Sequence, residues 1–192
     1  MEDHQPIHER NITVRTFEGG ENRIRVEGTL TDDRFCPSFL YSIMTFIEPG
    51  PVHRITVVMD VTLPRLIIEK AEARMSTVPV AYCREVENVV KKLVGLRITR
   101  GFTNKIRDLV GGRNGCLHMN QLILAMGAAA VQGSYAYYTR VREDGRIKSP
   151  DFDGSIILNS CHIWREGGPF ASRLEEMKKA SRNVRSPRHA FR

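Results

Sequence analysis

Alternating apolar and polar positions predict four strands in the first part of the chain. Residues 11–17 and 22–30 alternate on either side of a glycine-containing turn, which predicts an antiparallel hairpin. Residues 52–63 are rich in β-branched side chains, which favours a third strand. After Pro64, residues 65–76 also fit a helical pattern, but their alternation favours a fourth strand paired with the third.

Three later segments carry the apolar spacing of amphipathic helices. Apolar residues three and four positions apart predict helices over 84–96, 103–112 and 119–137, the last of them long and rich in alanine. Between the second and third strands, residues 38–47 form an apolar run that the turn sequence EPGP at 48–51 ends. Strands come first and helices follow, which is typical of an α+β fold with helices packed on an antiparallel sheet.

The composition agrees with one globular domain followed by a basic extension. Hydrophobic residues make up 41% of the 192 residues and charged residues 27%, so the chain can bury a core of ordinary size. We expect a single α+β domain over residues 1–165, with a short apolar strand within 151–164. Residues 166–192 are expected to form a basic C-terminal extension.

The positive charge is concentrated in this extension. The net charge is +7, and residues 171–192 alone hold seven Lys or Arg against two Glu. Such a segment fits contact with nucleic acid or with an acidic partner, but a solvated, partly helical end that keeps the protein soluble is the favoured interpretation. Phe191 is the one aromatic residue within 171–192, which argues against a surface that stacks single-stranded bases.

The sequence shows no segment that would take the protein to a membrane. No apolar stretch has the length needed to cross a bilayer, and the polar start MEDHQPIHER lacks the features of a signal peptide. We therefore expect a cytoplasmic protein with no membrane partner. In that reducing compartment the cysteines are expected to be free thiols or metal ligands rather than disulfides. The four cysteines are Cys36, Cys83, Cys116 and Cys161.

Four thiol and imidazole side chains at the edges of predicted elements form a candidate metal site. They are His53, Cys83, Cys116 and His118. Zinc binds Cys and His, and iron–sulfur clusters bind mostly thiolates with occasional histidine, so either group would suit these ligands. The chain contains no C-x-x-C pair, which argues against a zinc finger. On their spacing alone, ordinary packing explains these residues better than a metal site does.

Cys116 also fits catalysis without a metal. A thiol at the start of a helix tends toward the thiolate, and a nearby base can take its proton. His118, His53 and Asp60 are the candidate bases. The glycines of GGRNG, residues 111–115, lack the Lys-Ser/Thr pair of a P-loop, which argues against a nucleotide site.

These segments together resemble a bacterial domain family of unknown function. The shared features are a histidine before a strand, a Pro-x-x-x-Cys loop, a Leu-Val-Gly-Leu step and a Gly-Cys-x-His helix start. In this chain they are His53, residues 79–83, residues 93–96 and residues 115–118. The resemblance covers roughly residues 8–140 and implies a family without assigning an activity.

The layout is also similar to that of NifU-type iron–sulfur cluster scaffolds. In that family one ligand precedes a strand, a cysteine loop and helix follow, and a final ligand pair opens a long alanine-rich helix. His53, Cys83, Cys116 and His118 occur in this order, although the first is a histidine and the last two are not adjacent. The likeness implies a metal or cluster site rather than cluster assembly.

Three hypotheses about function follow from the sequence. The first is a protein that binds zinc or an iron–sulfur cluster through His53, Cys83, Cys116 and His118. The second is a cysteine-dependent enzyme of acyl transfer or hydrolysis that uses Cys116. The third is an accessory protein without catalytic activity whose basic extension binds nucleic acid or an acidic partner.

Overall fold

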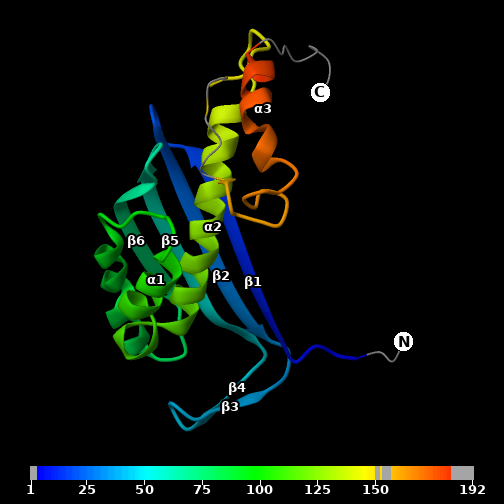
Figure 1. The fold of residues 1–192 in the computed structure, drawn as a ribbon. Coiled ribbons are helices and arrows are strands. Elements are labelled where there is room, and N and C mark those ends of the chain that lie inside the picture. The colour runs from blue at the N-terminus through cyan, green and yellow to red at the C-terminus, as the bar shows by residue number, and fades with distance from the viewer. Residues whose placement is uncertain (1–3, 150–151, 153–156, 183–192) are drawn as a thin grey trace. The chain divides into compact units, whose positions relative to one another are not determined.

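The structure is a computed structural model that describes residues 4–149, 152 and 157–182. Its main element is a four-stranded antiparallel sheet. Its strands are neighbours in the order β1-β2-β5-β6 (Figure 1). They are β1 (His8–Glu18), β2 (Arg23–Arg34), β5 (Gly50–Thr62) and β6 (Ile67–Thr77). The four strands predicted from alternation are confirmed, including the one over 65–76 for which a helical pattern was the alternative.

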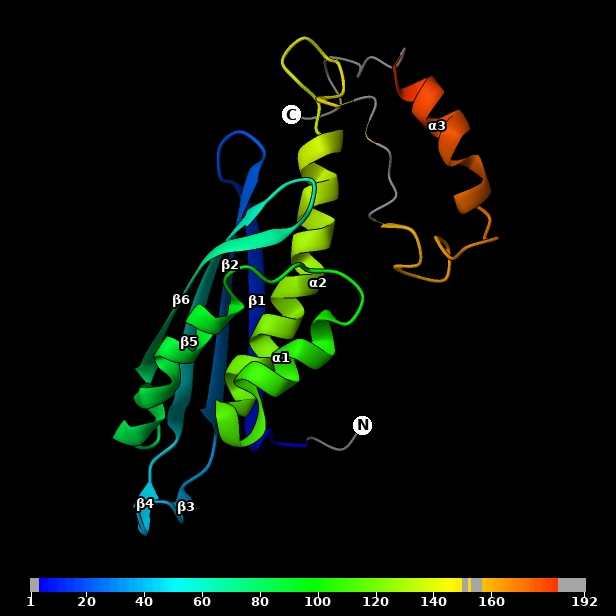
Figure 2. The same cartoon turned by 60° about the vertical axis from the view of Figure 1, so that its left-hand side comes forward.

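The apolar run at 38–47 forms a separate hairpin between β2 and β5. Strands β3 (Ser38–Leu40) and β4 (Thr45–Ile47) pair only with each other among the described residues. Figure 2 shows this hairpin at one end of the sheet, away from helices α1 and α2.

The helices follow the strands, as the sequence predicts. They are η1 (Ala81–Leu93), α1 (Phe102–Val110), η2 (Gly112–Asn114) and α2 (Leu117–Thr139). The segment expected as a helix over 84–96 is a 3₁₀-helix that begins and ends three residues earlier, with Val90 and Leu93 as its buried side chains. The long alanine-rich helix is confirmed, and it begins directly after Cys116.

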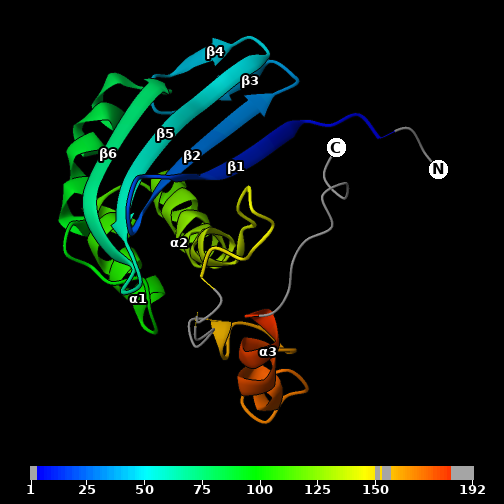
Figure 3. The same cartoon turned by 90° about the horizontal axis from the view of Figure 1, so that it is seen from above.

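Helix α2 packs against the sheet at a glycine of β2. A methyl group added to Gly28 would come within 2.7 Å of the Met126 sulfur and 2.9 Å of a Leu122 methyl carbon. Helix α1 packs against α2 at Gly127 of α2. An added Cβ there would lie 2.6 Å from the ring of Phe102 on α1. Figure 3 shows α1 and α2 on the same side of the curved sheet. The first turns of α2 are therefore held over β2 by close packing.

Contacts within the chain define two compact units, Met1–Ala130 and Val131–Arg192. In the second unit the ring of Phe152 stacks on Tyr138 at a centroid distance of 4.5 Å, and η4 (Ala171–Arg173) leads into α3 (Leu174–Ser181). The strand expected within 151–164 lies partly outside the described residues, and the described part, 157–164, contains no strand.

The basic extension stays a prediction over most of its charged residues. Residues 183–192 lie outside the described part of the chain, so the expected binding of nucleic acid or an acidic partner is untested there. Among the described residues, no helix combines the length and the apolar character that a membrane crossing requires.

Candidate functional site

Three elements bring a carboxylate and two imidazoles together at one end of the sheet. Asp32 on β2 and His53 on β5 are direct partners in the strand register, next to a β-bulge between Asp32 and Asp33. His118 lies in the first turn of α2. One ligand atom from each of Asp32, His53 and His118 lies within 4.8 Å of the other two. The two imidazole rings face each other with a centroid distance of 3.9 Å.

Asp32 is the centre of this group, because it is buried and its carboxylate contacts four side chains. Only 3% of the residue is exposed. Arg10 donates two hydrogen bonds to it, from Nε at 2.6 Å and Nη2 at 2.8 Å. The remaining contacts are with His53 Nδ1 at 3.0 Å, His118 Nε2 at 3.3 Å and His8 Nε2 at 3.4 Å. The buried carboxylate is thus paired with charge and hydrogen-bond donors, as burial of an ion requires.

Arg10 links the first strand to the last helix of this unit. While its Nε and Nη2 hold Asp32, its Nη1 donates a hydrogen bond to Gln121 Oε1 on α2. One side chain of β1 therefore fixes the position of the carboxylate relative to the first turns of α2.

The surroundings favour a charged carboxylate and neutral imidazoles. Burial by itself would raise the pKa of Asp32, but the hydrogen bonds and positive charge of Arg10 outweigh it and lower this pKa. Burial, followed by the neighbouring His53, lowers the pKa of His118 to about 4. Burial also lowers the pKa of His53, although Asp32 opposes the shift. Both shifts favour the neutral form of the imidazoles, and a neutral imidazole offers one nitrogen lone pair.

Cys116 lies beside this group. Its Sγ is 3.6 Å from His118 Nδ1, while the other nitrogen of the same ring contacts Asp32. The thiol is placed by a tight turn before α2, in which the Cys116 N–H donates to the Val110 carbonyl at 3.0 Å. At Gly115 a Cβ would lie 2.3 Å from that carbonyl oxygen, so this turn requires glycine.

One buried side-chain donor near this helix start has no hydrogen-bond partner among the described residues. Asn120 is 6% exposed, and its Nδ2 is a buried donor without a hydrogen bond in the described part of the chain. It lies one helical turn after Cys116 on α2, and residues four apart share a face of a helix.

The structure brings together three of the four predicted ligands. His53 and His118 belong to the close group, and Cys116 contacts His118. Cys83 is outside the group, because it lies near the start of η1, which packs along β6. The predicted catalytic residue, Cys116, has an imidazole at hydrogen-bond distance for a sulfur atom.

Asp32, Arg10 and His8 are not among the site residues that the sequence predicts. The alternation in β2 contained the signal for Asp32, because Ile24, Val26 and Leu30 are buried and Asp32 continues the same inward-facing series. A charged residue at an inward position of an amphipathic strand needs a partner, which makes it a candidate functional residue. His8 lies near the chain end, where order is least expected, yet it begins β1 and pairs with the end of β2.

Comparison with known families agrees with the resemblance seen in the sequence. The family described as "Protein of unknown function (DUF2889)" matches residues 8–132, so the chain belongs to this family. Its span includes every residue of the group around Asp32. Searches of curated proteins and of solved structures found no match. None of these comparisons shows the likeness to NifU-type scaffolds.

Proposed function

We propose that this protein binds a divalent transition metal, with zinc the first candidate, through Asp32, His53 and His118. The observation that carries the proposal is the convergence of one carboxylate oxygen and two imidazole nitrogens within 4.8 Å. Ligands of a tetrahedral zinc ion lie about 2.0–2.2 Å from it, which places them roughly 3.3 Å from one another. The distances from Asp32 to His53 Nδ1, 3.0 Å, and to His118 Nε2, 3.3 Å, are close to that separation.

The contacts of Asp32 leave a role for both of its oxygens. Oδ1 accepts from Arg10 Nε and faces His8, whereas Oδ2 accepts from Arg10 Nη2 and faces His53 and His118. A metal held by the two imidazoles would take Oδ2, and the bidentate hydrogen bonds of Arg10 to both oxygens would orient the carboxylate from outside the coordination shell. Such supporting hydrogen bonds typically raise metal affinity about 10–100-fold.

The donor set favours a single ion over an iron–sulfur cluster. Clusters are held mostly by thiolates. Cys116 is the thiol in contact with the group, and Cys83 does not join it. Imidazole and carboxylate ligands instead suit zinc and the neighbouring divalent metals. His8 contacts Asp32 and Cys116 contacts His118, so either side chain would be a candidate fourth ligand. A position left to water would allow metal-assisted hydrolysis.

Metal analysis of protein purified without a histidine tag tests this proposal. The expected result is about one equivalent of a divalent metal per chain. Asp32→Asn and His53→Ala should each weaken binding at least tenfold. His162→Ala is the matched control, because His162 is an exposed histidine of the second unit. Protein that is isolated without metal, and that takes up neither Zn²⁺, Mn²⁺, Fe²⁺ nor Ni²⁺, would contradict the proposal.

A cysteine nucleophile is the second candidate, and a different observation favours it. The imidazole of His118 lies between a thiol and a carboxylate. Its Nδ1 is 3.6 Å from Cys116 Sγ, and its Nε2 is 3.3 Å from Asp32 Oδ2. In such an arrangement the imidazole takes the thiol proton and the carboxylate orients the imidazole. Asn120 on the same helix offers the Nδ2 donor for a developing oxyanion.

Thiol alkylation separates the two candidates. If Cys116 is the nucleophile, iodoacetamide should modify it at least tenfold faster than the exposed Cys36 near neutral pH. His118→Gln should abolish that difference. If Zn²⁺ slows the reaction of Cys116 but not that of Cys36, the metal and the thiol compete for the same imidazole. Equal rates at the two thiols would eliminate the nucleophile.

A further inference from the structure

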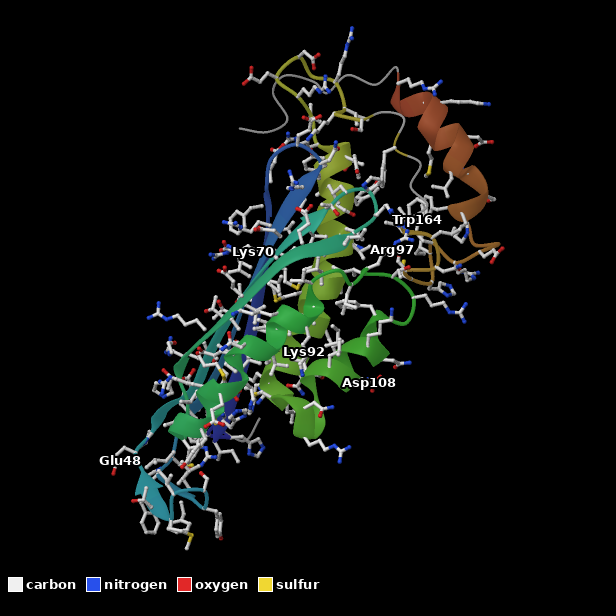
Figure 4. The ribbon with its side chains drawn as sticks, turned by 90° about the vertical axis from the view of Figure 1, so that its left-hand side faces the viewer. Glu48, Lys70, Lys92, Arg97, Asp108 and Trp164 are labelled. Carbon is white, nitrogen blue, oxygen red and sulfur yellow. The ribbon has the colours of Figure 1, made fainter. Side chains whose placement is uncertain are left out.

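A hairpin without charged residues joins the two strands that carry Asp32 and His53. We call residues 35–47 the arm; it contains β3 and β4 and has no Asp, Glu, Lys or Arg, and charges return at Arg34 and Glu48 on either side. Figure 4 shows the arm beyond the labelled Glu48, with its side chains directed away from the sheet.

The arm exposes large apolar side chains that a folded protein normally buries. Tyr41 is 80% exposed, Phe46 77% and Met44 70%, while Phe35 and Ile43 are about half exposed. The ring of Phe39 packs edge-on against Tyr41 and Phe46, with centroid distances of 5.0 and 5.1 Å. These contacts order the rings within the arm but leave their outer surfaces uncovered. A continuous apolar surface of this kind marks an interaction site.

The backbone of the arm is also incomplete. Strands β3 and β4 have three residues each and hydrogen bond only to each other among the described residues, so each has an open edge. A two-stranded hairpin is at best marginally stable in water, and open edges add strands from another chain. The arm therefore has both an apolar surface and strand edges available to a partner.

We propose that the arm is the dimerisation surface of this protein and that its occupant is the arm of a second copy. The two arms would pair antiparallel about a two-fold axis through the more exposed strand β4, which makes a four-stranded sheet. An arm without charges is complementary to itself, because no like charges meet when two copies face each other.

The exposed area agrees with a dimer. A large side chain offers about 150–250 Å², so the five exposed residues present roughly 600 Å² per copy. Two arms would bury about 1,200 Å², which is the lower end of the range for specific interfaces. A lipid surface fits less well, since Arg34 and Glu48 flank the arm with opposite charges and provide no cationic cluster for anionic headgroups.

Sedimentation velocity of the full chain, over about 1–200 µM protein, tests the proposal. The wild type should reach twice the monomer mass, and Phe46→Glu and Tyr41→Glu should remain at the monomer mass throughout. Tyr82→Glu is the matched control, because Tyr82 is 79% exposed on η1 and lies outside the arm. This control should dimerise like the wild type. Far-UV circular dichroism of each variant verifies that it is folded.

Three results would overturn the proposal. The first is a wild type that stays monomeric over the whole range, and the second is a dimer that persists in both arm variants. The third is a monomeric wild type that binds phosphatidylcholine–phosphatidylglycerol vesicles, together with a Phe46→Glu variant that does not bind them. That pair of results would assign the arm to lipid. None of these measurements depends on metal content, so the arm and the metal site can fail independently.

Discussion

The group around Asp32 and the arm lie next to each other in the fold and depart from the usual burial pattern in opposite directions. At Asp32 the sheet buries a charge where its alternation calls for an apolar residue. A few residues further along, the arm exposes aromatic rings where a loop is usually polar. The first departure is stabilised inside the chain by Arg10, whereas the second has no partner among the described residues. The contrast distinguishes a site completed by its own chain from a surface that needs another molecule.

Removing the buried carboxylate should give the largest change in stability. Asp32→Ala leaves the Arg10 guanidinium and three imidazoles without their common acceptor, so we expect a loss of about 2–4 kcal/mol in the free energy of unfolding. Urea denaturation of the metal-free protein measures it. The control is Asp60→Ala, because Asp60 pairs with the more exposed Arg25 and should matter much less. Equal losses for the two variants would mean that Asp32 is an ordinary surface partner.

Separating α2 from β2 should cause the next largest loss in the free energy of unfolding. Gly28→Val introduces side-chain atoms where Met126 and Leu122 already pack, so we expect a loss of about 1–3 kcal/mol. Metal affinity should fall as well, because His118 moves with α2 while Asp32 and His53 stay on the sheet. Calorimetric titration with Zn²⁺ measures the affinity. Unchanged affinity in a destabilised variant would show that α2 does not position the site.

Lowering the pH should reduce the contribution of the group around Asp32 to the free energy of unfolding. It should not change the contribution of the arm. An unfolded histidine takes up a proton near pH 6.5, whereas His118 does so only near its pKa of about 4. The unfolded state therefore binds more protons between these pH values. The free energy of unfolding should fall by on the order of 1–2 kcal/mol as the pH drops from 6.5 to 4, after allowance for the partial exposure of His118.

Denaturation of metal-free protein at a series of pH values measures this slope. His118→Gln should flatten it, and Phe46→Glu should retain the slope of the wild type. A wild-type stability that is constant from pH 7 to pH 4.5 would contradict a buried neutral histidine.

The arm should contribute least to the stability of the monomer. Phe46→Glu removes an exposed ring and should change the free energy of unfolding by no more than about 0.5 kcal/mol when measured at a concentration too low for dimers. The main expected effect of Phe46→Glu appears at high protein concentration, where the variant should fail to form dimers. A large loss at low concentration would instead indicate that the contact of this ring with Phe39 stabilises the monomer.

The sequence was sufficient to predict most of the sheet and helices of the first unit, because alternation and helical spacing are local signals. Strands at 11–17, 22–30, 52–63 and 65–76 and the long helix after Cys116 all agree with the structure. The helix at 84–96 was misplaced by three residues and is a 3₁₀-helix, since apolar spacing does not distinguish two helix types of similar pitch.

The candidate site was predicted in part, because pairing between distant segments is not a local signal. His53, Cys116 and His118 were identified from their chemistry at element edges. The direct pairing of Asp32 with His53 depends on the register of β2 and β5, which the sequence does not specify around a bulge. Cys83 was included on chemistry alone, and the packing of η1 along β6 leaves it outside the group.

The link from Arg10 on β1 to Gln121 on α2 has a consequence for biosynthesis. The two residues are 111 positions apart, and at about 5–20 residues per second the ribosome needs on the order of 5–20 s to pass from one to the other. For most of that interval the nascent chain carries Asp32 and His53 without His118, together with a complete, uncovered arm. Metal capture at the proposed site would therefore follow translation of α2, whereas protection of the arm against association with other chains would be needed earlier.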